Sequence, residues 1–164
     1  MDKNIKTSIC YNMLFKGECN YNEKCNFAHS LKEQHLVPNK KYVYDLLKST
    51  KSLENIDLHT NDTLYKELLI LCKLCIKCSN KKCTGGLNCR YGACLQQYVI
   101  CEQDLKYGNC KLEHDLIHLT KRGLKPYNVN TTNISDIDSL SDKLFEDDDE
   151  TDINELNEDE TIFQ

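Results

Sequence analysis

Two stretches of the chain carry apolar residues at helical spacing, and the first lies between residues 40 and 48. Val43, Leu46 and Leu47 would form one apolar stripe on a helix of about two turns. Pro38 stands just before this stretch and, as a helix breaker, is expected to keep the preceding connector irregular. The pattern therefore predicts a short amphipathic helix over 40–48.

The second stretch, residues 63–75, repeats apolar side chains with the same spacing and predicts a longer helix. Asn61 or Asp62 would cap its amino end. The positions that keep the helical spacing are Leu64, Leu68, Leu71 and Cys75.

The rest of the chain shows little periodicity, and its composition suits irregular structure. The 164 residues amount to one ordinary domain at most, with no Trp, four Phe and a charged fraction of 29%. Such a chain is poorly equipped to build a large apolar core. We expect a small, irregular fold with short α-helices that needs another source of stability.

Charge divides the chain into two parts. Residues 134–164 hold 13 Asp and Glu against one Lys, whereas residues 1–133 carry a net charge of +7. The acidic segment has few apolar residues, and we expect a disordered tail there. The basic part suits a polyanionic partner, because Lys and Arg displace counterions from phosphates.

Eleven cysteines indicate either disulfides or metal sites. The first ten residues contain no apolar signal segment, and no stretch reaches membrane-spanning length. We therefore expect an intracellular protein of the nucleus or cytoplasm, not secreted and not in a membrane. In that reducing setting the cysteines are expected to bind metal, and their odd number also argues against full pairing.

The clearest metal motif runs from Cys10 to His29. Cys10, Cys19, Cys25 and His29 are separated by eight, five and three residues. Three thiolates and one imidazole are the ligands that complete a tetrahedral zinc shell. The motif predicts a structural zinc site.

This segment resembles the CCCH zinc fingers of tristetraprolin- and muscleblind-like RNA-binding proteins, whose pattern is C-x8-C-x5-C-x3-H. Those fingers carry an aromatic residue two positions after the third cysteine, and Phe27 fills that place here. The resemblance implies that Phe27 stacks on a base of single-stranded RNA. The whole chain also looks like CCCH-type proteins encoded by large DNA viruses.

An internal repeat points to a second finger near the end of the basic part. The pattern I-C-x6-G-x-C occurs at residues 9–19 and again at residues 100–110. The predicted ligands of this last site are Cys101, Cys110, His114 and His118. This Cys2His2 set departs from the CCCH pattern in ligand type and in its shorter loop, and His114 or His118 could instead be an exposed histidine.

Six further cysteines lie between these two sites. Cys83-x5-Cys89 resembles the second half of a CCCH finger, but Ala93 stands where the histidine is expected and Cys94 follows it. We prefer Cys94 as fourth ligand and Cys75 as the first. Cys78 is the alternative first ligand, and Cys72 would be spare, although a shared site that uses all six thiols stays open.

The predicted organisation has five segments. They are a CCCH finger (1–38), a linker with a short helix (39–62), a helix with the central zinc site (63–99), a CCHH finger (100–128) and a disordered acidic tail (129–164). We expect two to three zinc ions. Four protein ligands leave a zinc ion no open position for substrate, and no catalytic motif is present, so an enzyme is not expected.

The most plausible function is zinc-dependent binding of single-stranded RNA in mRNA processing, mRNA stability or another step of gene expression. RNA of this kind is bound by stacking on aromatic side chains and by contacts to phosphates. The candidate contact residues are Tyr11, Phe15, Lys16, Lys24, Phe27, Arg90 and Tyr91.

Two other interpretations remain open. The aromatic side chains of the first finger could form its own miniature core. The protein could also be a zinc-organised adaptor for protein partners in transcription or the ubiquitin pathway. An adaptor would need an exposed apolar patch, which residues 40–48 and 64–71 could supply.

Overall fold

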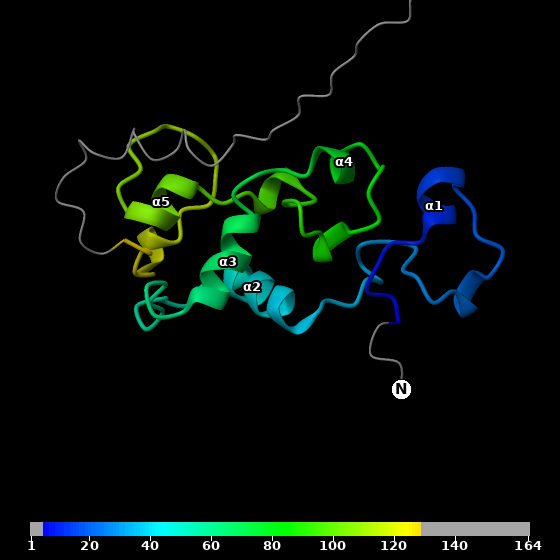
Figure 1. Cartoon of the computed structure of the whole chain (residues 1–164), viewed down its shortest axis with the longest axis horizontal. Helices are drawn as coiled ribbons and strands as arrows, with labels where there is room; N and C mark the ends of the chain where they lie inside the picture. The colour runs from blue at the N-terminus through cyan, green and yellow to red at the C-terminus, as the bar shows by residue number, and fades with distance from the viewer. Residues whose placement is uncertain (1–4, 129–164) are drawn as a thin grey trace, which may run out of the picture. The chain divides into compact units, whose positions relative to one another are not determined.

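The computed structural model describes residues 5–128 (Figure 1), so the expected acidic tail at 129–164 lies outside the described residues. The helices of the described part are α1 (Tyr11–Lys16), α2 (Pro38–Lys48), α3 (Asp62–Ile70), α4 (Ile76–Ser79) and α5 (Glu102–Tyr107). Four 3-10 turns accompany them at η1 (Asn22–Lys24), η2 (Gly86–Asn88), η3 (Gln96–Tyr98) and η4 (Thr120–Arg122).

Residues 5–128 form no extended strand. Four isolated parallel β-bridges occur instead, at Ile9–Ala28, Asp57–Lys125, Leu74–Ala93 and Ile100–Ile117. Among the helices of residues 5–128, none is long and apolar enough to cross a membrane. The expectation of a small, irregular fold with short helices is confirmed.

Helix α2 starts earlier than the sequence predicted. Pro38 does not separate the helix from its connector but begins it. Proline suits a first helical position because the amide hydrogen it lacks would have no partner there. Val43, Tyr44 and Leu46 are buried on the inner face of α2.

Helix α3 has the expected cap but ends sooner than predicted. The Asn61 side chain accepts a hydrogen bond from the Leu64 amide at 3.1 Å, as an N-cap does. The helix stops at Ile70 instead of reaching Cys75. Leu74 is held in a parallel bridge with Ala93, which requires extended backbone and overrides the helical pattern.

Replacing the cap, Asn61→Ala, is expected to lower the free energy of unfolding by about 1 kcal/mol, because the Leu64 amide loses its acceptor. Chemical denaturation of the zinc-loaded chain measures the change. Asn55→Ala, at an exposed loop position, serves as the control. Equal stability of the two variants would contradict the capping role.

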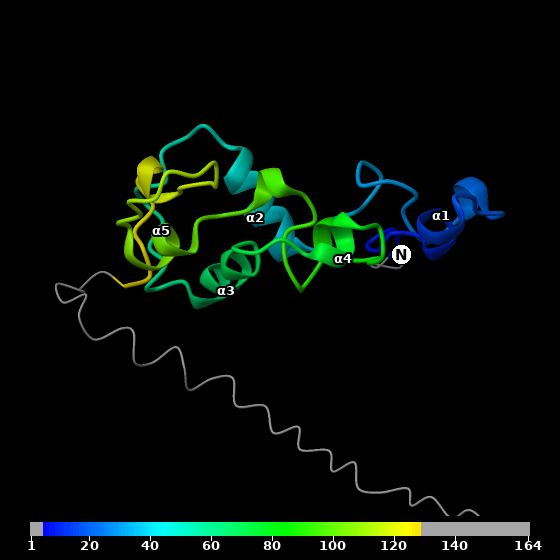
Figure 2. The same ribbon diagram turned by 90° about the horizontal axis from the view of Figure 1, so that it is seen from above.

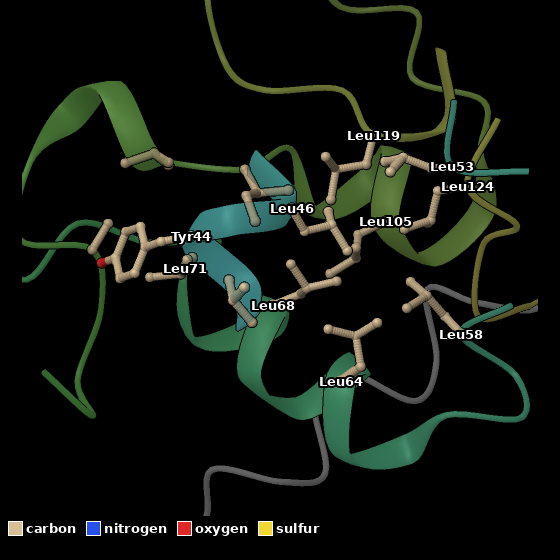
Figure 3. Packing of buried hydrophobic residues seen from close by; sticks show 14 residues of the cluster. Tyr44, Leu46, Leu53, Leu58, Leu64, Leu68, Leu71, Leu105, Leu119 and Leu124 are labelled. Carbon is tan, nitrogen blue, oxygen red and sulfur yellow. The ribbon is translucent and has the colours of Figure 1, made fainter. Parts of the chain in front are cut away.

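Helices α2 and α3 pack side by side, as both views show (Figure 1, Figure 2). They enclose a core that is larger than the composition suggested. Leu64 and Leu68 from α3, Leu46 from α2 and Leu105 from α5 all belong to this core (Figure 3). Other buried members of this core are Val43, Tyr44, Leu53, Leu58, Leu71, Ala93, Val99, Ile100, Leu119 and Leu124.

The loop after α2 joins the last metal-binding segment to this core. The Leu53 amide donates to the Arg122 carbonyl at 2.7 Å. The Arg122 guanidinium in turn donates to the carbonyls of Leu46, at 3.1 Å, and Ser49. Residues 39–62 and 100–128, which the sequence suggested as separate segments, therefore share one core.

The first finger contacts the central segment through polar groups. Buried Gln34 donates from Nε2 to the carbonyls of Thr7 (2.7 Å) and Gly85 (2.8 Å), and its Oε1 accepts from the Leu87 amide at 2.8 Å. Asn88 Nδ2 also donates to the Thr7 carbonyl at 2.7 Å. The bonds of Gln34 to Gly85 and Leu87 and the bond of Asn88 to Thr7 cross more than fifty residues of sequence and hold the two segments together.

Candidate metal centres

The first centre is assembled by a short parallel bridge. The Cys10 amide donates to the Ala28 carbonyl at 2.7 Å, and the Ala28 amide donates to the Ser8 carbonyl at 2.9 Å. This pairing places Cys10 beside His29, the residue that follows Ala28. The ligand atoms of Cys10, Cys19, Cys25 and His29 all lie within 4.8 Å of one another.

Local backbone geometry brings Cys19 to the same point. Helix α1 follows Cys10 directly and ends at Lys16, and Gly17 caps it with a left-handed φ of 77°. Glycine adopts this conformation without strain, and the chain turns back to deliver Cys19. The 3-10 turn η1 then leads into Cys25.

The first centre fits a zinc ion. The sulfurs of Cys10 and Cys25 are 3.8 Å apart, and two thiolates at a Zn–S distance near 2.3 Å would be separated by about 3.8 Å on a tetrahedron. His29 Nε2 is buried and has no hydrogen-bond partner among residues 5–128. A buried imidazole nitrogen without a partner is destabilising unless it binds a metal.

Thiolate formation at Cys10 is favoured by its surroundings. Burial acts to raise the pKa of Cys10, but the backbone amides of Met13 and Asn12 and the neighbouring thiols outweigh it. The pKa of Cys10 therefore lies below its ordinary value. A thiolate is the form of cysteine that binds zinc.

The central centre has the same scaffold with a different ligand set. The Leu74–Ala93 bridge is closed by the Cys75 amide, which donates to the Ala93 carbonyl at 2.8 Å. The ligand atoms that gather within 4.8 Å of one another belong to Cys75, Cys78, Cys83 and Cys89. The sulfurs of Cys83 and Cys89 are 3.9 Å apart, which suits zinc-bound thiolates.

The sequence-based preference for Cys94 as fourth ligand does not match this geometry. Cys78 completes the group because α4 starts directly after Cys75, and one helical turn brings residues three apart to the same face. Cys94 lies outside the group and is buried. Burial raises the pKa of the Cys94 thiol to about 11.

Cys72 is the spare thiol that the spacing suggested. It donates to the Leu68 carbonyl at 3.7 Å and belongs to none of the three groups. Burial raises the pKa of Cys72 to about 12, so the thiol stays protonated in the core.

The third centre brings together the four residues expected from the internal repeat. Ligand atoms of Cys101, Cys110, His114 and His118 lie within 4.8 Å of one another. The Cys110 sulfur is 3.2 Å from His114 Nε2, and the two histidine rings stack with centroids 4.7 Å apart. Neither histidine is fully exposed, so a purely surface role does not fit.

All three centres repeat one unit. In each, a residue before the first cysteine bridges a residue near the end of the unit: Ile9–Ala28, Leu74–Ala93 and Ile100–Ile117. A short helix follows the first cysteine in every unit. The sequence revealed two copies, because the central unit lacks the glycine turn and has a shorter first spacing.

A hollow of about 600 Å³ lies beside the first centre. Tyr11, Tyr21 and Phe27 line it, and all three aromatic side chains are more than half exposed. Lys24 and Thr84 also line this aromatic groove. Because these rings stay exposed, the alternative in which they form a miniature core does not fit.

The other candidate contact residues lie near these rings or near the central centre. Phe15 packs against Tyr11 with ring centroids 4.4 Å apart, and exposed Lys16 follows it on α1. The Arg90 guanidinium lies 5.1 Å from the centre of the exposed Tyr91 ring. Tyr21 is another aromatic residue that the sequence of the first finger offers for such contacts, whereas Thr84 was not predicted as a contact.

Comparisons with known proteins agree with the first centre. Residues 6–31 match the family of zinc fingers of the C-x8-C-x5-C-x3-H type (and similar). The chain is 33% identical to an uncharacterized protein of Acanthamoeba polyphaga mimivirus over 125 residues, which are 65% of this chain and 44% of that protein. No solved structure matches the chain.

The match spans less than half of the mimivirus protein. It confirms the resemblance to proteins of large DNA viruses, and the three Cys/His groups are consistent with zinc as the cofactor. The family match confirms that residues 6–31 form a zinc finger of the C-x8-C-x5-C-x3-H type, which indicates zinc-dependent nucleic-acid binding at the general level.

Proposed function

We propose that the protein binds single-stranded RNA in the aromatic groove beside the first centre. The observation that carries this proposal is the exposure of Tyr11, Tyr21 and Phe27 around one hollow. Exposed aromatic faces favour a single-stranded ligand, because its unpaired bases are free to stack on them. Zinc supplies no chemistry here beyond fixing the loops that present these rings.

Charge supports a nucleic-acid ligand at the same place. Lys24 lines the groove, and exposed Lys16 stands on the adjacent helix. The central centre offers a second platform, where Arg90 packs over the Tyr91 ring at 5.1 Å. A strand could place bases on aromatic rings at both centres and phosphates on the nearby cations.

The adaptor alternative is less well supported. It requires an exposed apolar patch on residues 40–48 or 64–71. Most apolar side chains of those segments instead pack in the core, where Val43, Leu46 and Leu68 are buried.

We further propose that the protein acts by binding and not by catalysis, because each centre has four protein ligands and no open position. The role that fits is in mRNA processing, mRNA stability or another step of gene expression, in the nucleus or the cytoplasm.

The variant Phe27→Ala is expected to weaken binding to single-stranded RNA by roughly 5- to 150-fold, because one stacked base is worth about 1–3 kcal/mol. Zinc content is expected to stay at the parent value, since Phe27 is no ligand. The measurement is titration of the zinc-loaded chain with RNA selected from a randomised pool, beside matched single-stranded DNA, across a salt series.

The matched control is Tyr42→Ala, which removes another half-exposed aromatic ring from α2, away from the groove. We expect this variant to bind like the parent. Equal affinity of Phe27→Ala and parent, with binding that disappears as salt rises, would mean that charge alone is responsible and would overturn the stacking proposal.

A further inference from the structure

The central unit holds a fifth thiol at the position where the other two units have a ligand. Cys94 follows Ala93, the residue that bridges Leu74. In the first unit His29 follows the bridging residue Ala28, and in the last unit His118 follows Ile117. By the register of the repeat, Cys94 therefore occupies the place of the final ligand.

Cys78 occupies a place that the other units do not use for metal. It stands three residues after the first cysteine of its unit. The corresponding residue is Met13 in the first unit, where it packs against the thiols. In the last unit it is Asp104, which is buried and accepts a hydrogen bond from the Thr120 amide at 3.1 Å.

The two thiols share one open space. Cys78, Cys83 and Cys94 all line a single cavity of about 580 Å³. Cys94 is only 4% exposed, so its thiol is held inside the protein. The central unit thus has two candidates for its fourth ligand.

We propose that Cys78 and Cys94 are alternative fourth ligands of the central zinc site, together with Cys75, Cys83 and Cys89. In the exchange, the Cys94 thiol loses its proton and its sulfur binds the metal. The Cys78 thiolate leaves and takes up that proton, so the charge of the site does not change. Either arrangement gives four thiolates, which is an ordinary structural zinc shell.

The exchange gives the site a thiol in reserve. With Cys94 bound, the central unit has the ligand register of the other two units, and Cys78 is released. With Cys78 bound, Cys94 stays protonated and buried. Loss of either thiol would leave a complete set of four ligands.

The test is the zinc content of the full chain and of four variants: Cys78→Ala, Cys94→Ala, the double variant and Cys72→Ala. Alanine offers no ligand atom. The parent, both single variants and the Cys72→Ala control are expected to hold three zinc ions, and the double variant two. A zinc content of two in the double variant also shows that the other centres remain folded.

Three results would overturn the proposal. Two zinc ions in Cys78→Ala would show that Cys94 cannot replace Cys78. Two zinc ions in Cys94→Ala, with three in Cys78→Ala, would make Cys94 the sole fourth ligand. Three zinc ions in the double variant would show that neither thiol is needed.

A second measurement needs no variant and does not depend on RNA binding. The zinc-loaded parent is alkylated under native conditions and its modified cysteines are located by mass spectrometry. The proposal expects molecules modified at Cys78 but not at Cys94, because Cys94 is bound to metal when Cys78 is free and is buried when Cys78 is bound. Double modification with three zinc ions retained would overturn it.

Discussion

Complete removal of zinc is expected to unfold residues 6–31 while α2 and α3 stay associated. The apolar cluster of the first finger consists of its ligands Cys10, Cys19 and Cys25, with Met13 packed against them. Without the metal only a few backbone hydrogen bonds hold these groups together, whereas zinc binding contributes about 10–16 kcal/mol in finger peptides. The helices rest on a separate apolar core. None of the buried residues of this core is a metal ligand, although Ile100 precedes the ligand Cys101.

Amide hydrogen exchange before and after chelation measures this difference. Exchange within residues 6–31 is expected to reach the rate of an unfolded chain, whereas the amides of α3 keep slower exchange. Restoring zinc should reverse the change. If α3 loses its protection as completely as the finger, the core depends on the metal as well and the expectation fails.

The second large effect is expected for Leu68→Ala, which should lower the free energy of unfolding by about 2–5 kcal/mol. Leu68 is fully buried on α3 and packs into the core that α2, α3 and α5 share (Figure 3). Truncation removes apolar contacts and leaves a cavity between helices that cannot close around it. Because small domains have a modest stability in total, the variant should be only marginally folded.

Chemical denaturation of zinc-loaded protein gives this free energy, and Leu112→Ala is the matched control. Leu112 is 69% exposed, so its truncation is expected to change stability by no more than about 0.5 kcal/mol. The zinc content of Leu68→Ala should remain at the parent value in the first finger. A change as small as that of the control would show that the core contributes little.

The sequence was most informative where ligands lie close together along the chain. Cys10 and His29 belong to a motif whose spacing alone specifies a zinc shell, and the repeat extended this to Cys101 and His118. The helix cap at Asn61 could also be predicted from the sequence, because capping depends on a few adjacent residues.

The sequence was less informative where distant segments decide the structure. Pro38 could end or begin a helix, and only the packing of α2 on the core shows that it begins one. The helical spacing of apolar residues predicted that α3 continues to Cys75. The helix ends earlier because the bridge of Leu74 to Ala93 requires extended backbone. The spacing of the cysteines allowed both Cys78 and Cys94 as ligands. Cys78 joins the group because α4 places its side chain beside the other three thiols.

The bonds made by Gln34 have a consequence for affinity. They fix the first finger against the central segment through Gly85 and Leu87, so the span between the two aromatic platforms does not vary as it would across a flexible linker. Under the proposed function, an RNA strand bound at Phe27 would present further bases to Tyr91 at a high effective concentration. Two weak contacts can then give an avidity far above either alone, and Gln34→Ala should reduce it without touching any ring or ligand.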